Sequence, residues 1–218
     1  MHRRRTLKTL GALALTHGLG FWQAARAAGV LLPPPGFYRL RGEVQINGRP
    51  ARPGMPVGPG DTVTTGADGE AIYIIGKDVY LQRDRSVVSI TGEALKSGLR
   101  VITGKLLAVF AKGARQIHVP TATIGIRGTA CYIEAAAEQV YFCLCYGTAE
   151  IVAANDPARA QTITTRYHDS PFYLHAGTSF LQAAPVINHS DAELILLESL
   201  VGRVPPFQEL PGFSTTRY

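Results

Sequence analysis

Three cysteines are the residues of this chain with the clearest capacity for chemistry. If residues 132–135 and 139–145 pair as a hairpin about Ala137, Cys131 lies opposite Cys143. Cys145 follows two positions later and points to the same face of the strand. We therefore expect the three sulfurs to share one patch. A slip of one residue in the register would move one strand's set to the other face, so this expectation depends on the turn.

Three roles for these cysteines remain open. Two of them could form a disulfide in an oxidising compartment, or all three could be small buried apolar residues. Alternatively, the thiolates could bind a metal ion or an iron–sulfur cluster that a histidine completes. His168 is the preferred additional ligand and His175 comes next. His189 is less persuasive, because its neighbours Ser190 and Asp191 already fit the cap of a helix.

No sequence signature of an enzyme accompanies these residues. The chain has no G-x-S-x-G elbow, no phosphate-binding P-loop, no H-E-x-x-H motif and no carboxylate pair of usable spacing. A pair formed by Cys145 and His168 would lack a third group to orient it. We therefore expect a protein without catalytic activity.

The positive charge is concentrated at the amino terminus. The formal net charge is +6, but residues 1–27 contain five arginines and lysines and no acid, so the remainder carries only +1. Such a nearly neutral body argues against nucleic-acid binding. With 218 residues and 46% hydrophobic content, the chain can form one domain with accessory segments.

Residues 1–27 have the pattern of an export signal. A basic start is followed by a modestly apolar run from Leu7 to Trp22 and by the small-residue cleavage pattern Ala25–Ala27. Arg3–Lys8 resembles the twin-arginine pattern, with Thr6 where phenylalanine is usual. We expect a periplasmic or secreted protein, with an uncleaved signal as a membrane anchor as the alternative. The twin-arginine route exports folded and often cofactor-loaded proteins, which favours the metal interpretation of the cysteines.

The rest of the chain is typical of an all-β protein. Short apolar-alternating runs recur every 8–12 residues between glycine, aspartate and asparagine turns. This spacing predicts a twisted β-solenoid-like fold or an irregular β-sandwich. One helix is expected over residues 190–201, because Ser190 and Glu193 form a capping box and Gly202 provides the stop.

The order of these motifs resembles that of the FecR domain family. The diagnostic stretch is a strand pair joined at Ile126–Thr129, and further matches are Pro120, Ala122, Tyr132, Ile133, Leu144, Gly147 and Ile151. Upstream, the family's "v-x-x-G-d-x-i-x-T" pattern matches Val57, Gly60, Asp61, Val63 and Thr65. The resemblance implies a FecR-like β domain over residues 37–152, after a Pro-rich entry segment over 28–36 and before an extension over 153–218.

The resemblance also implies a role. A stand-alone exported FecR-like domain is expected to bind a partner protein or small ligand in the cell envelope, in iron-responsive or cell-surface signalling. The membrane helix and carboxy-terminal signalling domain of FecR regulators are not recognisable here, so anti-sigma activity is not carried over. Arg127, Gly128 and Thr129 form either a structural bend or a partner-facing turn. The alternative function is a periplasmic metal or iron–sulfur protein that uses the cysteines.

Overall fold

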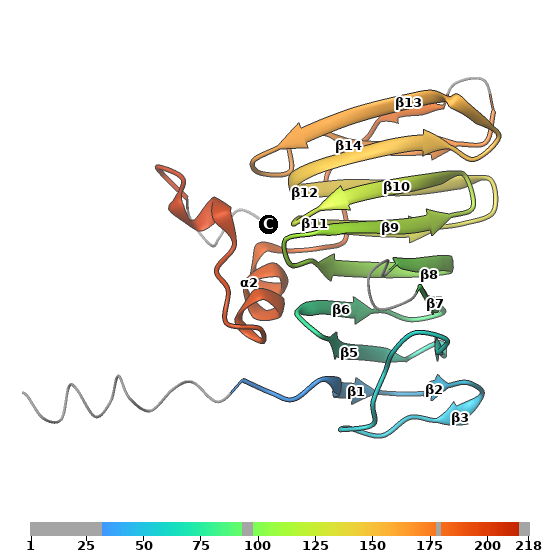
Figure 1. Cartoon of the computed structure of the whole chain (residues 1–218), viewed down its shortest axis with the longest axis vertical. Helices are drawn as coiled ribbons and strands as arrows, with labels where there is room; N and C mark the ends of the chain where they lie inside the picture. Colours follow the sequence, from blue (N-terminus) through green and yellow to red (C-terminus); the bar gives the residue numbers. More distant parts are fainter. Residues whose placement is uncertain (1–31, 93–97, 178–179, 214–218) are drawn as a thin grey trace, which may run out of the picture. The chain divides into compact units, whose positions relative to one another are not determined.

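The computed structural model describes residues 32–92, 98–177 and 180–213. The expected export signal therefore lies outside the described residues, as do the first positions of the entry segment. The described part is mostly β structure, as expected, and consists of two sheets that share two long strands (Figure 1). None of its helices is long and apolar enough to cross a membrane.

Sheet A forms the layer beneath the carboxy-terminal helix. Its strands, in spatial order, are β1 (Gly36–Arg41), β5 (Glu70–Ile75), β6 (Asp78–Gln82), β8 (Gly98–Val109), β11 (Ala130–Ala135), β12 (Gln139–Ala153), β14 (Pro171–His175) and β15 (Leu181–Ala183). All neighbouring strands of this sheet are antiparallel.

Sheet B forms the second layer. Its order is β3 (Arg49–Pro50), β2 (Val44–Ile46), β4 (Thr62–Thr65), β7 (Val87–Thr91), β8, β9 (Ala114–Val119), β10 (Ala122–Arg127), β12 and β13 (Asp156–Thr165). Only β8 and β9 are parallel among the described pairs. The expected all-β class is confirmed, and β8, β9, β10, β12 and β11 pair in a closed circuit that forms a five-stranded mixed barrel with the other strands at its periphery.

The shared strands change sheets at glycines. β8 pairs in sheet B through Thr103 and in sheet A from Gly104, whereas β12 pairs in sheet A through Tyr146 and in sheet B from Gly147. Both glycines have positive φ, 89° and 99°. A Cβ on Gly147 would lie 2.4 Å from Cγ2 of Thr129. Glycine is required at these bends because the backbone is left-handed and the neighbouring strand approaches closely.

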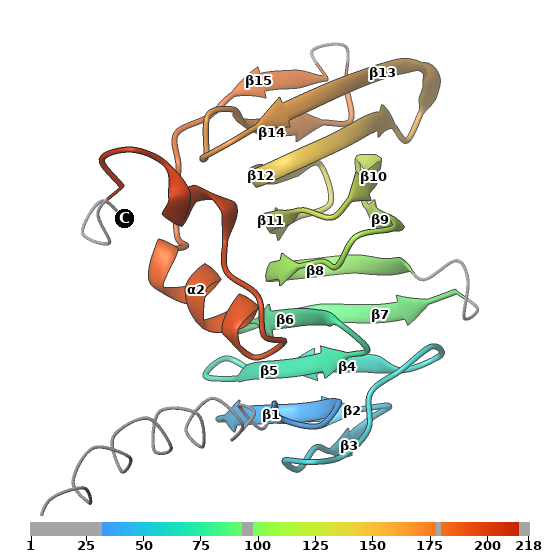
Figure 2. The ribbon, with the colours of Figure 1, turned by 60° about the vertical axis from the view of Figure 1, so that its left-hand side comes forward.

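Both faces of sheet A are buried, which explains why its strands are almost continuously apolar. Tyr73 and Phe142 point inward to the core between the sheets, whereas Ile72, Leu107 and Tyr132 point outward. The outward face packs against α2 (Asp191–Ser199) and the 3₁₀ helix η1 (Pro206–Glu209) (Figure 2). Alternation alone could not reveal this cover, because it is provided by a segment distant in sequence.

The helix begins at the expected N-cap and ends at Ser199, two residues before the expected end. Ser190 is its N-cap, and the reciprocal bonds of the capping box with Glu193 are present. Gly202 adopts a left-handed conformation after the helix, with φ 69°. The expected domain boundary at residue 152 falls inside β12, and strands continue to Ala183. The polar, exposed residues of β13 hid this continuation from a hydrophobic pattern.

The Arg127–Thr129 segment is a sharp bend between β10 and β11. Gly128 is left-handed with φ 63°, Arg127 is exposed and Thr129 is fully buried. Thr129 also packs beside Gly147, and its carbonyl accepts a hydrogen bond from the Phe110 amide. These contacts support the structural interpretation of the segment, and its partner-facing interpretation stays a prediction.

Candidate metal centre

The hairpin of β11 and β12 separates the three cysteines into two groups. Cys143 pairs with Tyr132, and Cys131 pairs with Leu144, so the register is shifted by one residue from the expected one. The loop is one residue longer than a turn centred on Ala137 allows, and this reverses the face of one strand. Cys143 and Cys145 consequently lie on the outer face of sheet A, whereas Cys131 lies in the core between the sheets. The expectation of one shared patch was wrong for Cys131.

Two histidines join the cysteine pair on the outer face. His168 follows β13, and its amide donates to the carbonyl of Cys145. His189 directly precedes the N-cap of α2. The ligand atoms of Cys143, Cys145, His168 and His189 lie within 4.8 Å of one another, and all four residues are buried. His175, the second expected histidine, instead lies on β14 and contacts Oε1 of Gln182 through Nε2 at 3.1 Å.

Two distances within the group are close to the edges of a small tetrahedron, and the remaining pairs of ligand atoms lie within 4.8 Å. His168 Nδ1 is 3.5 Å from Sγ of Cys143 and 3.1 Å from Nε2 of His189. Typical zinc–nitrogen and zinc–sulfur bonds give tetrahedral edges of about 3.3 Å between nitrogens and about 3.6 Å between nitrogen and sulfur. The four side chains could therefore hold a single metal ion with little rearrangement.

Neighbouring acceptors fix which nitrogen of each imidazole carries hydrogen. His168 Nε2 faces a carboxylate oxygen of Asp191 at 3.3 Å, and His189 Nδ1 lies 2.7 Å from the carbonyl of Ile187. Both partners only accept hydrogen bonds, so they favour the neutral tautomers with hydrogen on His168 Nε2 and His189 Nδ1. The opposite nitrogens then direct lone pairs at each other across 3.1 Å. A shared cation or proton is needed to make that approach favourable.

The Asp191 carboxylate, which faces His168, is itself held in place by a hydrogen bond. Asp191 is fully buried at the first position of α2, and its Oδ2 accepts a 2.5 Å hydrogen bond from the Tyr167 hydroxyl. A carboxylate or carbonyl behind each ligating histidine is the usual arrangement around protein metal ions, because it orients the ring and increases its basicity.

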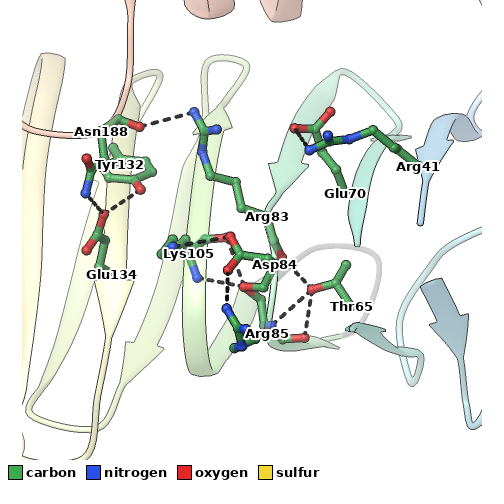
Figure 3. Close-up of polar contacts among 11 residues, drawn as sticks. Arg41, Thr65, Glu70, Arg83, Asp84, Arg85, Lys105, Tyr132, Glu134 and Asn188 are labelled. Atoms are coloured by element: carbon green, nitrogen blue, oxygen red, sulfur yellow. Dashed lines mark hydrogen bonds and ion pairs between the residues drawn. The ribbon is translucent and has the colours of Figure 1, made fainter. Parts of the chain in front are cut away.

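Polar contacts also hold the loop that carries His189 (Figure 3). Asn188 donates from Nδ2 to Glu134 at 2.7 Å, and its carbonyl accepts from Arg83 at 3.1 Å. Glu134 also accepts from the Tyr132 hydroxyl, and the ring of Tyr132 stacks on His189 with centroids 4.7 Å apart. The imidazole of His189 is thus fixed by its neighbours on sheet A.

Left-handed backbone conformations occur at His168 and at the residue before His189. His168 has a φ of 48° and Asn188, directly before His189, has a φ of 56°. A left-handed residue other than glycine costs about 1–2 kcal/mol, and such residues concentrate at functional sites. The fold tolerates this cost at the two positions that direct imidazoles toward the cysteine sulfurs.

The two thiols have opposite proton affinities. Donation from Cys145, with further contacts from His168 and His189, holds the pKa of Cys143 well below its usual range despite burial. Burial raises the pKa of Cys145, and the negative charge of Cys143 adds to that increase. The site therefore already stabilises one thiolate, which is the form that binds metals.

His189 and Asp191 are candidate site residues that local sequence patterns do not single out. The helix cap accounts for Ser190, which lies between them, and gives no reason to expect a ligand beside it. A Cys-x-Cys pair on one strand face, combined with a histidine just before a helix, was the available signal. What it lacked was the knowledge that α2 packs on β6 and β8 of sheet A, which brings the residue before its N-cap beside that strand.

Comparisons with known proteins add a likeness of fold. No family model matches the chain, and no curated protein matches it. Two crystal structures of a "putative anti-sigma factor" from Parabacteroides distasonis are similar, each at 8% identity. The match to the first structure has a TM-score of 0.48 and covers 56% of this chain and 58% of that structure's chain. The match to the second has a TM-score of 0.49 and covers 72% of this chain and 81% of that structure's chain. The chain thus spans less than two thirds of the first structure, and similarity at this level assigns no activity.

Proposed function

We propose that this protein is a non-catalytic metal-binding module that holds one zinc-class ion through Cys143, Cys145, His168 and His189. The observation that carries this proposal is the 3.1 Å approach of His189 Nε2 to His168 Nδ1 beside the sulfur of Cys143. Each ring is oriented by its own acceptor behind it. Two thiolates and two imidazoles in a closed tetrahedral arrangement are the typical ligands of structural zinc.

The geometry favours a single ion over an iron–sulfur cluster. In a two-iron cluster with two cysteines and two histidines, the cysteines bind one iron and the histidines bind the other. Such a cluster would separate the sulfurs from the nitrogens. Here His168 Nδ1 is as close as 3.5 Å to Sγ of Cys143, which suits ligands on the same ion.

A catalytic alternative follows from the same residues. Cys143, His168 and Asp191 contact one another in succession, in an order that is similar to a nucleophile, a base and an orienting carboxylate. However, Cys143 and Asp191 are fully buried, and the side chain of His168 is 1% exposed. A substrate could not reach the sulfur in this conformation, and this burial favours metal binding without turnover.

The test is metal analysis of the purified, reduced protein. We expect zinc in stoichiometric amount, and Co²⁺ substitution should give the intense visible bands of a tetrahedral thiolate site. Cys143→Ser and His189→Ala should each reduce the bound zinc at least tenfold, because loss of a ligand leaves the site open.

Two matched variants separate metal binding from general loss of a thiol or an imidazole. Cys131→Ala removes an equally buried thiol on the opposite face, and His175→Ala removes a histidine outside the group. Both should retain zinc. Metal-free protein with a disulfide, or protein that contains iron and inorganic sulfide, would contradict the proposal.

The location and the partner are further parts of the proposal. The basic, apolar amino-terminal pattern supports export, and the FecR-like order of motifs supports binding of an envelope protein or small ligand. Cell fractionation should find the protein in the periplasm, and replacement of Arg3 and Arg4 by lysine should retain it in the cytoplasm. Cytoplasmic location of the unaltered protein would exclude an envelope role.

A further inference from the structure

We infer that residues 184–213, here called the carboxy-terminal cover, close the metal centre, so that the ion exchanges only when this cover lifts from sheet A. The inference rests on the proposed metal site and concerns its regulation. It begins with the origin of the ligands. Cys143 and Cys145 belong to β12 of the sheet, whereas His189 belongs to the cover. The full ligand set therefore exists only while the cover is docked.

Aromatic side chains from the cover also seal the site. The fully buried ring of Phe207 lies 6.3 Å from the ring of His168 and 5.3 Å from that of Tyr167, measured between centroids. Phe213 packs against both Phe207 and Tyr167. Asp191 closes a further side by contacting His168 and Tyr167. The cover thus provides one ligand, one orienting carboxylate and much of the apolar roof.

The cover has a second attachment that does not involve the ligands. Leu197 is fully buried on the outer face of sheet A. Glu198 is 3% exposed, accepts a short hydrogen bond from the Tyr146 hydroxyl and pairs with Arg203. Arg203 in turn donates to the carbonyl of Lys77 at 2.6 Å. This attachment can be weakened while the metal ligands are left unchanged.

The two attachments must be thermodynamically coupled. If the ion binds only the docked state, docking strengthens metal binding by the same factor by which the ion strengthens docking. A variant that lifts the cover more often should therefore release the ion faster. This coupling makes the cover a device that controls how long the metal remains bound.

The experiment compares zinc release from full-length variants to an excess of a colorimetric chelator. Glu198→Gln keeps the side chain's size but removes the charge that accepts from the Tyr146 hydroxyl of β12 and that orients Arg203 toward the Lys77 carbonyl. Loss of this buried charged hydrogen bond to the sheet should accelerate release roughly tenfold. The matched control is Ile117→Val, which weakens the core between the sheets without contacting the cover. Its release rate should stay within about twofold of the unaltered protein.

Hydrogen exchange of the unaltered protein provides an independent measurement if Glu198→Gln fails to fold. Amides of α2 should become more protected when zinc is added, whereas those of β2 and β4 should change little. Zinc-loaded protein whose α2 protection equals that of the metal-free form would overturn the inference. So would equal release from Glu198→Gln and the unaltered protein. Both results presuppose bound zinc and so differ from failure of the metal site itself.

Discussion

Removal of zinc should lower the thermal unfolding midpoint of this protein by about 8–16 °C. At a free zinc concentration near 1,000 times the dissociation constant, binding to the folded state alone contributes about 4 kcal/mol. For a chain of this size, each kcal/mol shifts the midpoint by about 2–4 °C. Calorimetry of zinc-loaded protein, before and after dialysis against a chelator, measures the difference.

The expected shift should be reversible and should depend on the ligands. Restoring zinc should recover the original midpoint, since the ion binds deprotonated ligands that the fold already holds together. Cys143→Ser should unfold at one temperature with or without chelator, whereas Cys131→Ala should retain the zinc-dependent difference. A chelator that leaves the midpoint of the zinc-bound protein unchanged would show that the ion does not favour the folded state.

The sequence predicted the β architecture because local signals determine it. Alternating apolar residues, turn glycines and the Ser190–Glu193 capping box specify strands, bends and one helix, and the structure confirms these features. These signals also identified Cys143, Cys145 and His168 as candidate ligands, and the structure places all three together. Their proximity follows from a strand face and from the first loop after β13.

The remaining ligand depended on information that no local pattern contains. One residue of hairpin register decides whether Cys131 lies opposite Cys143, on the outer face, or opposite Leu144, in the core between the sheets. That register is set by the short loop between β11 and β12, whose sequence has no strong turn signal. His189 reaches the site only because α2 packs on the outer face of sheet A, which is a long-range contact. Local sequence rules predict that an amphipathic helix will be buried, but they do not say against which strands.

The bends that carry the long strands between sheets lead to the second large expected effect. Gly104→Ala should destabilise the protein by about 3–5 kcal/mol, which is at the upper end for a single substitution. The added Cβ would lie 2.4 Å from the Cα of Ser86 and 2.2 Å from its Oγ, and the backbone φ of 89° is itself unfavourable for alanine. Ser86, which directly precedes β7, is fully buried, and its Oγ accepts a hydrogen bond from the Lys105 amide. The start of β7 therefore has little room to move away from an added Cβ.

Gly60→Ala separates the two contributions to that effect. Gly60 has nearly the same φ, 92°, but a Cβ there would meet no atom within 4 Å. Its substitution should therefore cost only the backbone term, about 1–2 kcal/mol. Urea unfolding of both variants measures the difference. Equal losses would mean that the close approach of Ser86 contributes nothing, and the bend of β8 would then require glycine only for its dihedral angles. A larger loss for Gly104→Ala would show that contact between the two strands also fixes the place where β8 passes from one sheet to the other.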